Sequence, residues 1–194
     1  MSKESFANLI ITKLNGTLGQ SGSAYSSSTP KQAQAVIGEA ITEYLIANTT
    51  ITISYNGVLN TGGGADVIVS DTMKIMGNCS LTSAPSSFEG WITTLQSAIA
   101  SAFTVVSPST QGVVVTFQPF NSTTGALQIP QANLKVAHEG NPKSPTLAVW
   151  TVICGGILDW LNSSLGKNPS ATAIAATRTG ISSGTTALLS ITVT

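Results

Sequence analysis

The chain has 194 residues, of which 42% are hydrophobic, so it is long enough to form one domain with a packed core. Only 8% are charged, against about 25% in typical soluble domains; the formal net charge is zero, and serine and threonine make up about a quarter of the chain. The charge balance argues against a nucleic-acid surface, because such a surface needs clustered basic residues and the seven lysines are scattered. The composition also favours a protein covered by other subunits over a low-charge monomer.

The N-terminal residues predict a short helix followed by a flexible linker. Residues 3–15 carry apolar side chains on one helical face, at Phe6, Leu9, Ile10 and Leu14. Residues 16–28 are rich in glycine and serine, which is typical of a linker. We therefore expect residues 1–28 to form an arm that can reach away from a single domain spanning residues 29–194.

The next unit predicts a capped helix that runs into a β-hairpin. Thr29 to Gln32 has the form of a capping box with proline at the first helical position. Apolar residues then recur at helical spacing, at Ala33, Ile37, Ala40, Ile41, Tyr44 and Leu45. From Ile51 onward the apolar residues recur at every second position, which predicts a strand. Residues 65–70 predict its partner, across a glycine-rich turn at 60–64.

Two further units repeat this order of cap, helix and strand. Ser86 to Glu89 predicts the cap of an amphipathic helix. Its apolar stripe consists of Phe88, Trp91, Ile92, Leu95, Ile99, Ala102 and Phe103. A buried strand is predicted at 113–117, and another at 125–129 that is broken by Pro130 and continues at 133–137.

The third helix is predicted from Ser144-Pro145 to about Leu165 and is apolar on most sides, so it should be the most buried element. Gly155 and Gly156 lie in its middle and each costs about 1 kcal/mol relative to alanine. We therefore expect another backbone to approach closely there. Two strands, at 171–178 and 186–194, close the chain.

These elements together predict an α+β fold. We expect a mostly antiparallel, hairpin-connected sheet with three or four helices packed on one of its faces, plus the short N-terminal helical arm.

The sequence predicts no catalytic, cofactor-binding or metal site, and hence no enzyme. The single histidine, His138, lies in a polar stretch that reads as a loop, without the nucleophile elbow of a serine hydrolase. Asp66 and Asp71 lack the spacing of a calcium loop. Gly62 to Gly64 lacks the lysine of a phosphate loop and is better explained as a hairpin turn. Glu39 and Glu43 are expected on a solvated helix face.

The remaining candidate residues are cysteines and tryptophans. Cys79 and Cys154 are too few for a disulfide framework; Cys154 is expected to be a buried free thiol, and a single bridge between the two stays open. Trp150 and Trp160 lie roughly 80° apart around the third helix, so one of them is a candidate for contact with a partner. No signal peptide is recognised, and the most apolar stretch, 147–158, is too short to span a bilayer.

The chain resembles small structural proteins of tailed bacteriophage virions. The resemblance lies in the charge-poor Ser/Thr/Gly/Ala composition and in the short N-terminal helix followed by Ser-Gly-Ser-Ala-Tyr-Ser-Ser-Ser at 21–28. The resemblance lies also in the helical residues 40–48, which are followed by Ile51-Thr52-Ile53-Ser54 and by the glycine-rich turn at 60–64. The resemblance implies a repeated subunit of a capsid, neck, tail or baseplate, without catalysis.

The favoured hypothesis is therefore a non-catalytic virion protein that contacts copies of itself and other virion proteins, and neither nucleic acid nor membrane. It would be made in the host cytoplasm without a signal peptide. The alternative is a surface binding module, or adhesin, that recognises a carbohydrate or a host receptor. That alternative predicts an exposed concave site with aromatic and amide side chains.

Overall fold

The computed structural model describes eleven segments of the chain: residues 2–18, 30–59, 66–82, 86–106, 113–114, 119–120, 126–141, 143–163, 175–176, 181–182 and 188–193. They form an α+β fold, as the sequence predicts. The helices are α1 (Lys3–Leu18), α2 (Pro30–Asn48), α3 (Phe88–Ala102), α4 (Gln131–Gly140) and α5 (Pro145–Asn162). The strands are β1 (Thr50–Leu59), β2 (Asp66–Gly77), β3 (Phe103–Val106), β4 (Val113–Val114), β5 (Ala175–Ala176), β6 (Ile181–Ser182) and β7 (Leu188–Val193).

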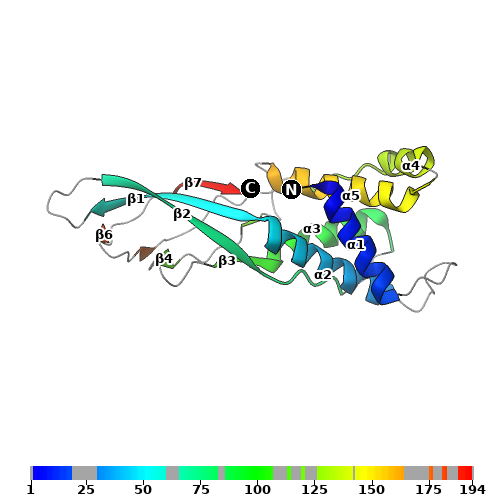
Figure 1. Ribbon diagram of the computed structural model, residues 1–194, viewed down its shortest axis with the longest axis horizontal. Helices are drawn as coiled ribbons and strands as arrows, with labels where there is room; N and C mark the ends of the chain where they lie inside the picture. Colours follow the sequence, from blue (N-terminus) through cyan, green and yellow to red (C-terminus); the bar gives the residue numbers. More distant parts are fainter. Residues whose placement is uncertain are drawn as a thin grey trace.

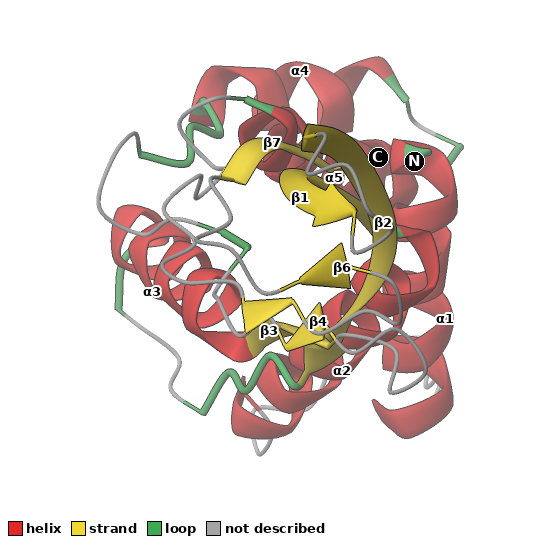
Figure 2. Cartoon of the chain, turned by 90° about the vertical axis from the view of Figure 1, so that its left-hand side faces the viewer, coloured by secondary structure: helices red, strands yellow, loops and turns green. Residues whose placement is uncertain are grey.

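The sheet is built on the hairpin of β1 and β2, which pair antiparallel over almost their whole length. β3 adds to the end of β2, while β6 and β7 pair with different parts of the other edge of β1. β4 and β5 form a separate antiparallel pair. The hairpin projects away from the helices (Figure 1), and the sheet curves so that β3 lies opposite β7 (Figure 2).

The helices gather at one end of the molecule and pack mainly on one another (Figure 1). α1 contacts α2 and α5, and α4 contacts α5, while the main contact of a helix with a strand joins α2 to β2. The inner-face residues Ile51 and Ile75 share one core with the helices, but the helices pack mostly on one another and do not form a single layer along the sheet. The physical reason is α5, whose apolar residues face most directions and need other helices around them.

The first helix belongs to the core, which corrects the prediction of an arm that leaves the domain. Phe6, Ala7 and Ile10 of α1 have no exposed surface. The apolar stripe of α1 is covered by α2 and α5 of the same chain, so its burial needs no second subunit. The linker residues 19–29 lie outside the described part of the chain.

The predicted strands around Pro130 are also corrected. Residues 126–130 form no strand, and the stretch expected to continue it is α4. The buried backbone N–H of Leu127 donates to Oε1 of Gln96 at 2.8 Å. A side chain of α3 thus accepts the hydrogen bond that a neighbouring strand would accept in a sheet. Pro130 occupies the N-cap position, after which alanine, leucine, lysine and glutamate favour a helix. The expected loop around His138 is the last turn of that helix.

Several predictions are confirmed. α5 begins with proline and ends near the predicted residue. α3 is capped by a serine, as expected, but by Ser87 instead of the Ser86 of the predicted capping box, and Ser87 Oγ accepts the Gly90 N–H at 3.0 Å. A Cβ on Gly156 would lie 3.1 Å from the backbone oxygen of Gln128, which is the close backbone approach expected there. Of the strands predicted at 113–117, 171–178 and 186–194, the described residues contain β4, β5 and β7. The turn at 60–64 is not described.

Candidate functional site at the sheet and the tryptophan groove

Charged residues are divided unevenly between helices and strands. The helices carry Lys3, Glu4, Lys13, Lys31, Glu39, Glu43, Glu89, Lys135, Glu139 and Asp159. Among the strands, within their bounds in the structure, only β2 carries charges, at Asp66, Asp71 and Lys74. β7 pairs with β1 on one side, and no other described strand pairs with its second edge. The described sheet therefore ends on this side in an uncharged strand.

The register of the sheet aligns hydroxyl residues in rows across β7, β1 and β2. One row joins Thr192, Thr52 and Thr72, and the next joins Ser190, Ser54 and Ser70. Neighbouring strands lie about 4.8 Å apart, so residues in a row are adjacent. Thr72 is exposed. Met76 lies four residues further along β2, hence on the same face, and is 55% exposed. At Thr72, therefore, the row that it shares with Thr52 lies on the outer face of the sheet.

The opposite face is apolar and turned inward. Ile51 stands between Val193 and Met73 in the register and has no exposed surface. Ile75 and Val105, which pair between β2 and β3, are also buried. One side of the curved sheet thus supplies core, and the described residues of the other side expose Thr72, Lys74 and Met76.

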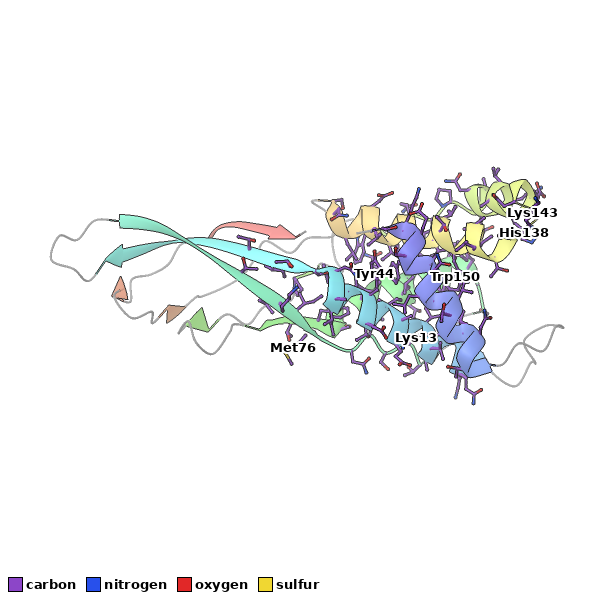
Figure 3. The ribbon with its side chains drawn as sticks, in the orientation of Figure 1. Lys13, Tyr44, Met76, His138, Lys143 and Trp150 are labelled. Carbon is purple, nitrogen blue, oxygen red and sulfur yellow. The ribbon has the colours of Figure 1, made fainter. Side chains whose placement is uncertain are left out.

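A second candidate site is a groove of about 440 Å³ at the junction of α2, α3 and α5. We call it the tryptophan groove. It is lined by Gln34, Ile37, Ser86, Ser87, Phe88, Trp91, Trp150 and Ile153. Trp150 lies within the helical body (Figure 3) and, like Trp91, is half-buried. Trp160 is buried, so Trp150 is the tryptophan of α5 that remains accessible.

The aromatic side chains of the groove are held in a fixed arrangement. The rings of Trp91 and Trp150 meet edge to face, with centroids 6.4 Å apart and planes at 77°. Phe88 continues the row, with its centroid 5.9 Å from that of Trp91. The indole Nε1–H of Trp91 donates to Oε1 of Gln34 at 2.8 Å. This bond fixes the Gln34 carboxamide and directs its oxygen to the indole.

The residues weighed as chemical sites from the sequence lie elsewhere. His138 is exposed at the end of α4, in the region of Lys143 (Figure 3). Glu39 and Glu43 are exposed, as expected, but both also bind Lys13 of α1, at 2.8 and 2.9 Å. No group of three metal-binding side chains occurs among the described residues, and the side chains of Asp66 and Asp71 are not described.

The two cysteines are free thiols, so the bridge left open by the sequence is not formed. Both are buried. Burial raises the pKa of Cys79 to about 12 and raises the pKa of Cys154 as well. Neither thiol is therefore a nucleophile at neutral pH, because the reactive thiolate is hardly populated.

Of the groove residues, the sequence singled out only Trp150 as a candidate contact; Trp91 was assigned to the core stripe of its helix, and Gln34 was not considered. Gln34 lies on the partly exposed side of α2, and only its bond to Trp91 reveals a role. Tryptophans on separate predicted helices were the feature of the sequence that could have indicated this groove.

No described helix combines the length and apolarity that a membrane crossing requires. Comparison with models of protein families, with curated proteins and with solved structures finds no match.

Proposed function

We propose that the chain is a non-catalytic structural subunit of a tailed-phage virion, repeated in a capsid, neck, tail or baseplate. The observation that carries the proposal is the uncharged edge strand β7, which borders an outer face of hydroxyl residues. Its proposed partners are copies of the chain and other virion proteins.

The physical argument concerns the second edge of β7, with which no described strand pairs. An edge presents backbone N–H and C=O groups that can pair with another chain, and monomers usually protect it with charges or proline. β7 carries neither. Burying serine and threonine hydroxyls costs much less than burying charges, provided that they find hydrogen-bond partners. The exposed Met76 adds a residue type that interfaces favour. A second subunit could therefore cover this region at low cost.

The direct test is the mass of the native protein. Light scattering coupled to size exclusion, with electron microscopy of the peak, should show rings, tubes or another closed oligomer. A strictly monomeric protein at high micromolar concentration would contradict the proposal. An antibody against the chain should label purified particles of the phage that encodes it, which tests the virion assignment separately from self-assembly.

A charged substitution on the edge strand tests the proposed surface. Thr192→Lys places a charge in β7, in the register position opposite Thr52, and it should weaken self-association at least tenfold. Ser97→Lys is the matched control, because Ser97 is exposed on α3, in the helical body. Equal self-association of the two variants would show that contacts lie elsewhere. Circular dichroism and thermal unfolding should establish that both variants fold.

A further inference from the structure

We propose that the tryptophan groove binds an uncharged saccharide. This inference goes beyond the proposed structural role and does not depend on it, because a virion subunit and a monomeric surface module could both carry such a site. It rests on the size of the groove, the absence of charge in its lining, and the hydrogen-bonding groups that its side chains have left to offer.

The size and construction of the groove suit a small ligand. Its volume of about 440 Å³ lies within the range of about 300–1,000 Å³ that is typical of ligand pockets. Its walls come mainly from three helices, with Ser86 and Ser87 just before α3, and Ile37 and Ile153 beneath it are buried in the core. The positions of the lining side chains are thus set by packing, so little ordering is needed on binding.

The lining selects against charged ligands. Its described residues are aromatic, aliphatic, amide or hydroxyl, and none is charged. A carboxylate or ammonium group that entered the groove would lose water without gaining an opposite charge. The occupant should therefore be neutral and should combine an apolar face with polar edges.

The hydrogen-bonding groups of the lining side chains narrow the class of ligand further. Trp91 Nε1–H already donates to Gln34 Oε1, and Ser87 Oγ already accepts from Gly90 N–H. These groups can still donate, from Gln34 Nε2 and from the serine hydroxyls, and Gln34 Oε1 and Ser87 Oγ can each accept one more hydrogen bond. A pyranose matches this requirement. Its hydroxyl and ring oxygens accept hydrogen bonds, and its C–H face can lie against an indole ring such as Trp150.

A proline-rich peptide is the main competing ligand, because such peptides also dock in aromatic grooves. Proline residues carry no N–H, so a proline-rich peptide would bring few donors to the remaining acceptor positions of Gln34 Oε1 and Ser87 Oγ. Saccharide hydroxyls both donate and accept, and this favours the saccharide.

The test is a titration of the full-length protein with cellobiose, lactose and N,N′-diacetylchitobiose, followed by calorimetry and tryptophan fluorescence. We expect saturable binding of at least one disaccharide with a dissociation constant in the micromolar to millimolar range. Trp150→Ala should weaken this binding at least about tenfold, and Trp150→Phe should weaken it less, because a ring remains. A decaproline peptide serves as the competing probe.

Gln34→Glu tests the donor role with little change of shape. The carboxylate can still accept from Trp91 Nε1–H, but it removes the Nε2 donors and adds charge, so saccharide binding should fall at least tenfold. Gln128→Glu adds the same charge at an exposed position outside the groove and should leave binding unchanged. The inference is overturned by no saturable binding of any disaccharide, by undiminished binding in folded Trp150→Ala or Gln34→Glu, or by tighter binding of decaproline. Self-association is measured separately, so failure here leaves the assembly proposal standing.

Discussion

The phenol ring of Tyr44 stacks on the ring of Phe6, with centroids 4.2 Å apart and planes within 5° of parallel. The Tyr44 hydroxyl also donates to the backbone oxygen of Ser2 at 2.7 Å. These two contacts join the beginning of α1 to α2, although 38 residues separate the two rings in the sequence (44 − 6). They make the N-terminal helix a structural part of the core.

Phe6→Ala should therefore destabilise the fold by about 3–5 kcal/mol, because it leaves a cavity among fully buried residues. Tyr44→Phe keeps the stacked ring, loses one hydrogen bond and should cost about 1 kcal/mol. Urea unfolding of both variants measures these differences. If Phe6→Ala unfolds at the wild-type urea concentration, α1 does not contribute to the core in solution.

The adjacent glycines of α5 should respond oppositely to alanine. A Cβ on Gly155 would meet Lys3 Cδ at 3.5 Å, an ordinary contact, so Gly155→Ala should stabilise by up to about 1 kcal/mol through helix propensity. A Cβ on Gly156 would lie 2.9 Å from Cγ1 of Ile129, besides the nearby Gln128 backbone oxygen, so Gly156→Ala should destabilise. Thermal unfolding distinguishes the two. A rise of the melting temperature in both variants would mean that residues 126–130 do not press on α5.

The ion pairs of Lys13 predict a pH-dependent contribution to stability. Hydrogen bonds to Glu39 first, and to Glu43, raise the pKa of Lys13 above its usual 10.5. Its contribution is therefore fully present below that value and is lost as pH rises through the raised pKa of the folded state. Because the glutamates are 67% and 57% exposed, Lys13→Met should cost no more than about 1 kcal/mol at neutral pH.

Urea unfolding at about pH 7 and about pH 12 checks this prediction, because the difference between wild type and Lys13→Met should shrink toward zero at the higher pH. Lys31→Met is the control, since Lys31 is exposed on α2 and makes no ion pair with a described residue. A pH-independent difference for Lys13→Met would assign its effect to packing of the side-chain stem rather than to charge.

The thiols should be unreactive in the folded protein. Burial of Cys79 and Cys154, and the raised pKa that follows, leave almost no thiolate at pH 8. We expect no reaction with Ellman's reagent within minutes under native conditions, and reaction of both thiols after denaturation with guanidinium. Rapid modification of Cys79 in the native protein would reveal opening of the loop that follows β2.

The sequence predicted the helices and strands in which one spacing of apolar residues continues over many positions. The amphipathic stripe of α3 and the apolar length of α5 extend over several turns, and the change of period at Ile51 marks the beginning of the hairpin. α4 was missed because Pro130 resembles a strand breaker as much as a helix cap, and because no residue of this helix is buried. Its position depends on α5, which local sequence does not reveal.

The candidate sites could be predicted less well, because they depend on contacts between distant segments. The bond that joins Trp91 to Gln34 spans 57 residues, and nothing in either segment specifies the other. The pairing of Thr52 with Thr72 follows once the hairpin register is known, whereas the alignment of Thr192 depends on how the end of the chain returns to β1. The apolar face of α1 had to be buried against another element, but the sequence of α1 does not indicate that α2 and α5 bury it.

The hydroxyl rows across β7, β1 and β2 also determine how a contact made through them would respond to its surroundings. Serine and threonine neither titrate in the physiological range nor attract an ion atmosphere, so the charge that added salt can screen beside these rows is that of Lys74, in the next row of the same face. An assembly held through this face should keep its affinity from dilute buffer to concentrated salt and across several pH units. That constancy would suit a particle that must remain intact in whatever water it reaches.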